Sequence, residues 1–191
     1  MLYKFLYYLL WPIYKILFFF TIRNKPKDLP EGKLIICSNH INLMDPFTLA
    51  LGFRKKHIYF VSKKELFDNK FLAYFMRKLG AFPIDREGID LKAVKKCVKV
   101  LNEDKYLGIF PEGTRVKEVK KENIKNGIGY IALKANADIL PLEIVNGYKL
   151  FGRMRLDFKP IIKINNYKDL DKRKAYDRIA EDVYKSIYDI I

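Results

Sequence analysis

The stretch Leu34-Ile35-Ile36-Cys37-Ser38-Asn39-His40-Ile41-Asn42-Leu43-Met44-Asp45-Pro46 decides how the chain is expected to fold. Its first four residues are apolar and predict a short buried strand. Asp45 and Pro46 then begin a helix that runs to Phe53, with Asp45 as N-cap and Pro46 at the first helical position. A histidine, His40, lies between the two elements, five residues before the carboxylate. Imidazole has an ordinary pKa of about 6.5, so we expect a catalytic base where this strand turns into a helix.

The alternation of strand and helix continues along the chain. Further strands are predicted at 58–61, 82–84, 106–110 and 139–145, with one or two more between 153 and 164. Further helices are predicted at 71–79, 90–103, 127–137 and about 169–191. Strands separated by helices need crossover connections, which indicates an α/β fold with a largely parallel central sheet flanked by helices. Ligands of such folds bind beyond the carboxyl ends of the strands, where the sequence places Asn39, His40, Arg86, Glu112 and Gly113.

Size and charge limit the classes of protein to consider. The 191 residues are enough for one sizeable core, and half of them are apolar. Lys and Arg total 37 against 22 Asp and Glu, so a formal net charge of +15 should attract the protein to polyanions such as nucleic acid or an anionic membrane. Both cysteines, Cys37 and Cys97, occupy apolar positions, so we expect no disulfide framework and a reducing compartment.

The N-terminal segment favours the membrane among these polyanions. Residues 2–22 are almost wholly apolar or aromatic, but Lys4, Pro12 and Lys15 interrupt them. This pattern predicts a helix that lies in the headgroup layer of a membrane, followed by a linker at 24–32. A transmembrane anchor and a helix docked on the protein core are the alternatives.

Four stretches of the sequence agree in order and spacing with the motifs of one family. They are His-x-x-x-x-Asp at His40 and Asp45, preceded by Asn39; Gly-x-x-x-Ile-x-Arg at Gly80–Arg86; Phe-Pro-Glu-Gly-Thr-Arg at Phe110–Arg115; and an aliphatic residue two before a proline at Ile139–Pro141. Through these motifs the chain resembles the glycerolipid acyltransferases, in particular the lysophosphatidic acid acyltransferases, over residues 33–145. One such motif alone is weak evidence, whereas four in sequence are specific.

The resemblance implies roles for individual residues. His40 is the expected general base, which takes the proton of the acceptor hydroxyl, and Asp45 is expected to orient its ring. Arg86 is the first choice for the phosphate of the acceptor, because guanidinium binds phosphate through two parallel hydrogen bonds. The other residues implied in acceptor binding are Glu112, Gly113, Thr114 and Arg115. Those implied in supporting roles are Asn39, Gly80, Lys64, Lys125 and Pro141.

Several of these residues also have structural interpretations. His40 alone is typical of a packed core histidine, and Asp45 of a plain helix cap. Lys64 and Lys125 fit a solvated cationic surface that meets anionic headgroups. Pro141 is expected to shape the site from the end of a strand. A carboxylate repels phosphate, so Glu112 is expected to contact a glycerol hydroxyl or an arginine.

The implied reaction transfers a fatty acyl chain from acyl carrier protein or coenzyme A to the sn-2 hydroxyl of 1-acyl-sn-glycerol-3-phosphate, giving phosphatidic acid. No bound cofactor is expected, and no metal, because the two histidines and two cysteines are too dispersed for ligand spacing. The expected partners are an anionic membrane surface, the lysophospholipid acceptor and the thioester donor, with no nucleic acid. The expected parts are a membrane-associated helix at 1–23 and an acyltransferase domain at 24–191, at the cytoplasmic face of the cell membrane.

Three other functions remain open from the sequence. The first is an acyltransferase that acts on another lyso-lipid or on glycerol phosphate. A hydrolase would use Ser38 or Cys37 as nucleophile with His40 as its base, although Ser38 lacks a glycine-flanked elbow. A non-catalytic binder of anionic lipid or nucleic acid would need only the charge, but the basic residues show no recognisable nucleic-acid module.

Overall fold

One mostly parallel sheet organises the chain. The computed structural model describes residues 2–53, 56–84, 91–115 and 124–188, and in these residues seven strands form a sheet of order β1-β7-β6-β2-β5-β3-β4. The strands are β1 (Thr21–Arg23), β2 (Leu34–Ser38), β3 (Ile58–Lys63), β4 (Ala81–Ile84), β5 (Tyr106–Ile109), β6 (Ile139–Val145) and β7 (Arg155–Phe158). Neighbouring strands are parallel except β6 and β7, which are antiparallel. The predicted α/β class is confirmed.

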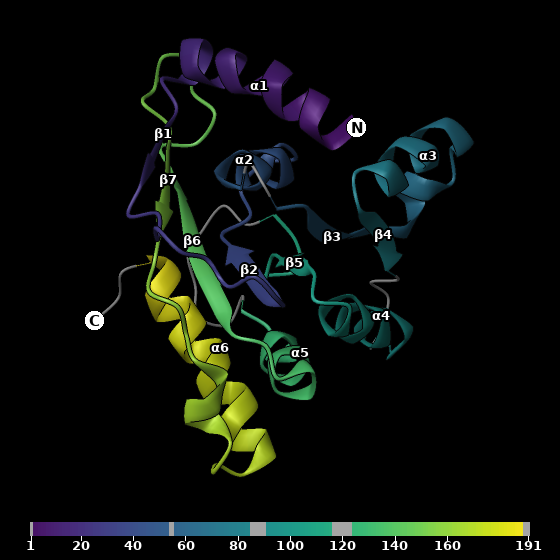
Figure 1. Ribbon diagram of the computed structural model, residues 1–191, viewed down its shortest axis with the longest axis vertical. Coiled ribbons are helices and arrows are strands. Elements are labelled where there is room, and N and C mark those ends of the chain that lie inside the picture. Colours follow the sequence, from purple (N-terminus) through teal and green to yellow (C-terminus); the bar gives the residue numbers. More distant parts are fainter. Residues whose placement is uncertain (1, 54–55, 85–90, 116–123, 189–191) are drawn as a thin grey trace.

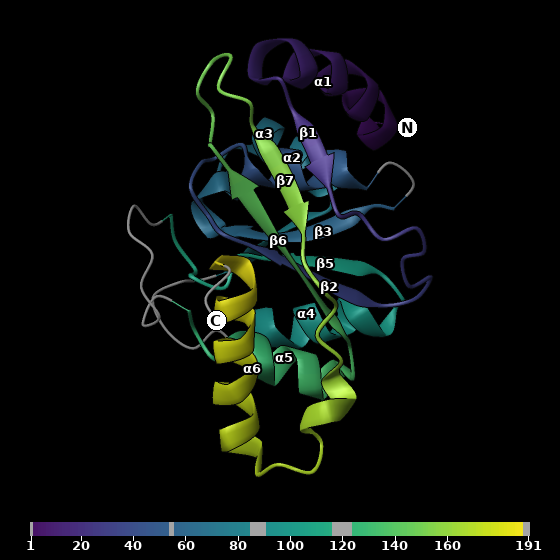
Figure 2. The same ribbon diagram turned by 90° about the vertical axis from the view of Figure 1, so that its left-hand side faces the viewer.

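Helices cover both faces of this sheet (Figures 1 and 2). They are α1 (Leu2–Phe18), α2 (Asp45–Gly52), α3 (Lys70–Lys78), α4 (Leu91–Asn102), α5 (Gly127–Ala135) and α6 (Lys172–Tyr188), with short 3₁₀ turns at Lys64–Phe67 and Ile164–Tyr167. Successive residues of β2 point to opposite faces, so Ile35 and Cys37 join a core with α4, α5 and α6. Leu34 and Ile36 join a second core with α1 and α2. The alternation therefore fixes which helices pack on which face.

The N-terminal segment differs from the expected pattern in one element. The first helix ends at Phe18, and Thr21–Arg23 forms β1, which pairs in parallel with β7. Phe19 has a left-handed backbone (φ 46°), which breaks the helix, and Phe20 beyond it is fully buried. The strand was missed because the apolar run hides a turn at a phenylalanine, a residue that rarely adopts this conformation.

The first helix has a packed face and an exposed face. Tyr14 is 1% exposed and packs into the core with Trp11 and Leu10 at its side, whereas Phe5 and Ile16 are 63% and 65% exposed. Pro12 lies within this helix. Within the described residues, no helix combines the length and the apolar character needed to cross a membrane.

Candidate active site

A histidine and an aspartate meet in the loop between β2 and α2. His40 Nδ1 lies 2.8 Å from Asp45 Oδ2, and the same oxygen accepts the backbone N–H groups of Ile41 (2.7 Å) and Asn42 (2.8 Å). The Asp45 side chain is fully buried, whereas that of His40 is 13% exposed. When neutral His40 donates Nδ1–H to Asp45, Nε2 carries the lone pair, which is the form needed by a general base.

Asp45 does not cap its helix, contrary to the sequence-based prediction. The helix begins at Asp45 itself, the cap position is Met44, and no side chain makes a capping hydrogen bond there. The carboxylate instead reaches back to the loop N–H groups before the helix. Asp45 Oδ2 binds these two N–H groups and the imidazole, so it does not accept a hydrogen bond from the first turn of the helix, as the oxygen of an N-cap would.

A tyrosine from the opposite end of the sequence holds the second oxygen of Asp45. Tyr148, in the segment between β6 and β7, donates its hydroxyl to Asp45 Oδ1 at 2.7 Å and lies 2.7 Å from Thr48 Oγ1. Burial, and next the charge of Asp45, raise the pKa of Tyr148, so this hydroxyl keeps its proton and remains a donor. The sequence analysis missed Tyr148. The available signal was its position just beyond the end of β6, whose carboxyl end lies beside that of β2.

The loop after β5 supports the histidine from its other side. Glu112 is 2% exposed; its Oε2 accepts the backbone N–H of His40 at 2.8 Å, and its Oε1 accepts the hydroxyl of Tyr188 from α6. Burial raises the pKa of Glu112 above its ordinary value. Phe110 stacks on the imidazole, with ring centroids 4.2 Å apart and planes 16° from parallel. Both ends of the His40 loop are therefore held by buried groups.

The end of β2 is tied to β6 by a side chain. Asn39 Nδ2 donates to the Ile144 carbonyl (3.1 Å), and the Ile144 N–H donates to Asn39 Oδ1 (2.8 Å). Ser38 is fully buried and donates to Asn39 Oδ1 at 3.0 Å. Cys37 is also fully buried, and burial raises the pKa of its thiol. Neither residue offers an accessible nucleophile, which removes the geometric basis of the hydrolase alternative.

The residues of the third motif surround a sharp turn. Gly113 has φ +72°, and a Cβ there would lie 3.4 Å from Lys125 Nζ. The Lys125 N–H donates to the Pro111 carbonyl at 3.0 Å, which places this lysine beside the turn. Thr114 and Arg115 are exposed. Arg86, the predicted phosphate ligand, lies outside the described residues.

The remaining predicted residues lie in neighbouring parts of the fold. Gly80 has φ +81°, and a Cβ there would lie 2.7 Å from Nε2 of His57. Lys64 is exposed at the start of the 3₁₀ turn after β3. Pro141 is buried in β6, between the isolated bridge Ile139–Ile162 and the first β7 pair at Leu142. Pro141 has no N–H to donate, so it fits a position of β6 that lies between these two pairs.

A largely apolar cavity of about 440 Å³ adjoins the histidine. Its walls come from α1, α2, α3 and the sheet, and His40, Ser62, Lys63 and Arg115 supply polar groups to its lining. The apolar lining includes Leu6, Leu10, Phe47, Leu51, Leu72 and Met76. The described residues contain no cluster of His, Cys, Asp or Glu that could hold a metal ion. The arrangement thus places one proton acceptor and one guanidinium on the wall of a space suited to an apolar ligand.

Comparisons with known proteins show the family of the chain. A family model described as "Acyltransferase" matches residues 20–145. The 1-acyl-sn-glycerol-3-phosphate acyltransferase of Bacillus subtilis is 34% identical over 140 residues, covering 71% of this chain and 69% of that protein. The enzyme of the same name from Streptococcus pneumoniae is 31% identical over 147 residues, covering 74% of this chain and 54% of that protein.

A solved structure supports the fold. The crystal structure of the 1-acyl-sn-glycerophosphate (LPA) acyltransferase PlsC from Thermotoga maritima superposes with a TM-score of 0.62 at 18% identity, covering 96% of this chain and 93% of that chain. At this identity the likeness concerns the architecture of sheet and helices.

Proposed function

Because the chain belongs to the acyltransferase family, we propose that it transfers a fatty acyl group from a thioester to the sn-2 hydroxyl of 1-acyl-sn-glycerol-3-phosphate, giving phosphatidic acid. The names of its relatives support this acceptor. The observation that carries the proposal is the His40 ring, aligned by Asp45 at 2.8 Å on the wall of an apolar cavity.

In the proposed reaction, His40 Nε2 takes the proton of the acceptor hydroxyl as its oxygen attacks the thioester carbonyl. The tetrahedral intermediate collapses, the C–S bond breaks, and the departing thiolate takes the proton from the imidazolium. Asp45 stabilises that imidazolium and fixes the tautomer. The donor is acyl carrier protein or coenzyme A; both are anionic, so the charge of +15 favours their approach. No covalent acyl-enzyme is required.

The cavity beside His40 is the proposed place of a fatty acyl chain. Its lining is mostly apolar, and burying a methylene contributes about 0.8 kcal/mol. A chain bound there would bring a carbonyl toward the imidazole.

The acceptor phosphate is assigned to Arg86 and Arg115, with the backbone N–H groups of Gly113 and Thr114. Arg115 lines the cavity, as His40 does, which supports its share of this role. For Glu112 we propose a positioning role, because both carboxylate oxygens already accept hydrogen bonds from within the protein. Lys64 and Lys125 are assigned to the cationic surface around the site.

We place the enzyme on an anionic membrane at its cytoplasmic face. The exposed apolar side chains of α1 support membrane contact, and the burial of both cysteines, Cys37 and Cys97, fits a reducing compartment.

The test is an assay of purified protein in lipid or detergent, with both donors, several lyso-lipid acceptors and mass spectrometry of the product. We expect His40→Ala to lower kcat by about 10²- to 10⁴-fold. The matched control is His57→Gln, which changes the other histidine and should leave kcat nearly unchanged. Full activity in His40→Ala would exclude this residue as the base.

A second pair of variants tests acceptor binding. Arg115→Ala and Arg86→Ala should raise KM for the phosphate-bearing acceptor, by roughly tenfold or more for a lost charge-assisted contact. Arg173→Ala, at an exposed position of α6, is the control with the same loss of charge. An unchanged acceptor KM in both site variants would contradict the phosphate assignment.

A further inference from the structure

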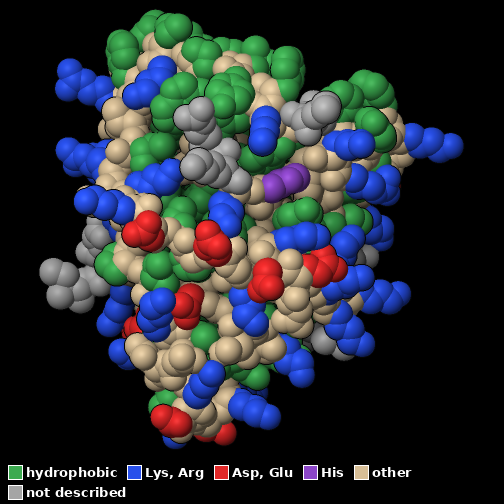
Figure 3. Space-filling model, viewed as in Figure 1, with side chains coloured by type: hydrophobic (Ala, Val, Ile, Leu, Met, Phe, Trp, Pro, Cys, Tyr) green, Lys and Arg blue, Asp and Glu red, His purple; other side chains and the backbone are tan. Residues whose placement is uncertain are grey.

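Exposed large apolar side chains gather at one end of the described molecule, on three separate elements. These are α1, α3 and the segment 146–154 between β6 and β7, which we call the hairpin tip. Figure 3 shows apolar surface along α1 and again over α3, with Lys and Arg side chains around it. The members that are more than half exposed are Phe5, Tyr8, Ile16, Phe71, Tyr74, Leu150 and Phe151. Soluble surfaces rarely hold so many apolar side chains together, which marks this end as a contact surface.

The hairpin tip is fixed to the end of α1. The Phe151 N–H donates to the Leu17 carbonyl at 2.7 Å, and the Met154 N–H donates to the Phe18 carbonyl at 2.8 Å. Leu150 and Phe151 are nevertheless 59% and 61% exposed. Phe151 also has a left-handed backbone (φ 58°), which is unfavourable for a bulky side chain. Its ring contacts that of Phe19, with centroids 5.6 Å apart, but Phe19 is itself 50% exposed. The two rings therefore form an aromatic pair that faces solvent on a segment that is tied down.

The third helix exposes its own aromatic face beside the same cavity. Phe71 is 73% exposed and Tyr74 58% exposed, while Leu72 and Met76 of this helix line the cavity. Leu6, Tyr7 and Leu10 of α1 line it too. Both helices therefore flank the cavity with one face and present apolar side chains to solvent with another.

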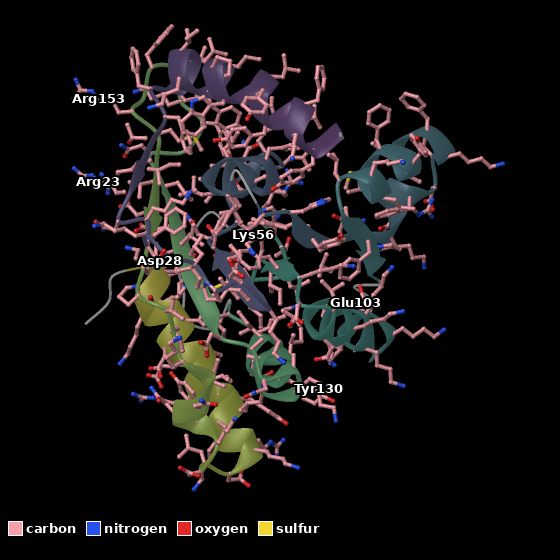
Figure 4. The ribbon with its side chains drawn as sticks, in the orientation of Figure 1. Arg23, Asp28, Lys56, Glu103, Tyr130 and Arg153 are labelled. Carbon is pink, nitrogen blue, oxygen red and sulfur yellow. The ribbon has the colours of Figure 1, made fainter. Side chains whose placement is uncertain are left out.

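The charge of these elements identifies the partner. None of the three contains Asp or Glu, and their cationic residues are Lys4, Lys15, Lys70, Arg77, Lys78, Lys149 and Arg153. In Figure 4, Arg153 points away from the body of the molecule. Apolar side chains edged by cations are typical of surfaces that bind anionic bilayers. In a dimer formed through this surface, two basic surfaces would face and repel each other, which disfavours a second copy of the chain as the partner.

We propose that α3 and the hairpin tip join α1 in a single contact surface for an anionic bilayer. Contact at three elements fixes the orientation of the protein on the membrane, with the helices that flank the cavity against the lipid. As far as delivery of the lipid substrate is concerned, the inference rests on the proposed function, because an acyl chain then moves between bilayer and cavity without crossing water. Membrane contact by α3 and the hairpin tip follows from their own side chains.

The first experiment measures binding of the full chain to vesicles of phosphatidylcholine with phosphatidylglycerol, by cosedimentation. Phe71→Ser/Tyr74→Ser and Leu150→Ser/Phe151→Asn should each weaken partitioning by about tenfold, because each pair removes apolar groups from the interface. Asn tolerates the left-handed backbone at 151, so this change should not unfold the protein. The control pair is Tyr130→Ser/Leu170→Ser, two exposed apolar residues away from this surface, on α5 (Figure 4) and just before α6. Unchanged binding by both surface pairs would overturn the proposal.

The second experiment locates each element directly, without a loss of affinity. In a Trp11→Phe background, which removes the single tryptophan, Phe71→Trp and Leu150→Trp report on α3 and on the hairpin tip, and Leu170→Trp is the control. Lipids brominated on their acyl chains should quench the first two tryptophans and leave the third bright. Emission that is insensitive to these lipids at both 71 and 150 would refute contact by these elements.

The third set of measurements separates this inference from the proposed function. Vesicle binding requires no catalysis, so an inactive protein that still needs α3 and the hairpin tip for binding would leave the inference standing. The surface pairs should keep the thermal midpoint and the turnover of a short-chain acceptor dissolved as monomer. Sedimentation equilibrium tests a second copy as occupant: a dimer broken by the surface pairs, with vesicle binding unchanged, would contradict a bilayer partner.

Discussion

The carboxylate of Asp45 is bound on both oxygens, and that fixes the direction of the His40 ring. One oxygen accepts two backbone N–H groups and faces the imidazole, and the other accepts the Tyr148 hydroxyl. A buried carboxylate with these partners cannot rotate without losing several hydrogen bonds at once. We infer that the ring of His40 is held in one orientation before any substrate binds.

Removal of the Tyr148 hydroxyl should therefore misalign the base. We expect Tyr148→Phe to lower kcat by on the order of tenfold to a hundredfold, because a small displacement of a catalytic group has this effect. KM for the acceptor should change little, since Tyr148 contacts Asp45 and Thr48 and acts through them. Steady-state kinetics with both substrates varied checks this split. The control is Tyr130→Phe, which removes an exposed hydroxyl. If Tyr148→Phe raised KM for the acceptor and left kcat unchanged, a positioning role would be contradicted.

Burial of Glu112 predicts a pH dependence of stability. Burial raises the pKa of this carboxyl above its ordinary value of 4.5, so the folded state holds its proton more tightly than the unfolded state. The resulting stabilisation is fully present below pH 4.5 and is lost as pH rises through the folded pKa. A glutamine has no such titration, and it can still accept from the His40 N–H and donate to Tyr188.

The stability of Glu112→Gln relative to the native chain should thus increase as pH rises. Urea unfolding at a series of pH values between 4 and 8 measures this difference. Glu103→Gln, at an exposed carboxylate whose pKa is lowered by the hydrogen bond from Lys105, should not gain stability relative to the native chain as pH rises. A difference for Glu112→Gln that is constant with pH would show that burial does not govern this carboxyl.

The sequence could predict the pair His40–Asp45 because both residues lie in one local motif. Tyr148 and Tyr188 are 103 and 76 residues from their carboxylate partners, Asp45 and Glu112. Only the completed sheet and the docked α6 bring them together, and a lone tyrosine carries no signal of its partner. Local chemistry was therefore predictable, whereas the groups that hold it in place were not.

At the scale of elements, α5 and α6 pack more closely than any side chain would allow. A Cβ on Gly129 would lie 2.7 Å from the Tyr176 carbonyl oxygen and 2.8 Å from its Cα. These are backbone atoms, so relief requires the helices to separate. Since α6 carries Tyr188 to Glu112, this contact links helix packing to the His40 loop.

Gly129→Ala should consequently destabilise the protein by about 1–3 kcal/mol, the usual effect of overpacking. Gly127→Ala is a matched control on the same helix, because beyond its chain neighbours and its own helix backbone no atom lies within 4 Å of the added methyl. We expect that control to be neutral or to stabilise by up to about 1 kcal/mol, since alanine restricts the unfolded chain. Thermal and urea unfolding of the two variants give the comparison. Equal stabilities would mean that α5 and α6 adjust without cost.

Most elements were predictable because the spacing of apolar residues along the sequence follows the buried face of each helix or strand. The strand predicted at 139–145 has the bounds of β6, and the helix predicted at 71–79 differs from α3 by one residue at each end. The strand β1 was not predictable, since its three residues have a mixed exposure pattern and owe their conformation to pairing with β7. A short edge strand depends on its partner more than on its own sequence.

At the scale of the whole molecule, α1 serves the core as well as the surface. Tyr14 is almost fully buried and packs edge-on against Phe20, with ring centroids 5.8 Å apart. Thr48, which contacts Tyr148, also lies within hydrogen-bond distance of the Tyr14 hydroxyl, at 3.4 Å. The helix that carries apolar side chains outward is thus connected through Thr48 to the hydrogen bonds around Asp45.

Deletion of residues 1–18 should therefore unfold the protein rather than release an intact domain from the membrane. Removal of one large buried aromatic side chain costs about 3–5 kcal/mol, and a whole domain is stable by only about 5–15 kcal/mol. Phe5→Ser/Ile16→Ser is the matched comparison, because it changes only side chains that are 63% and 65% exposed. We expect the deleted chain to lose its cooperative thermal transition and the serine pair to keep it. A deleted chain that melts cooperatively near the native midpoint would show that α1 is an appendage, and that the cavity and the Asp45 hydrogen bonds form without it.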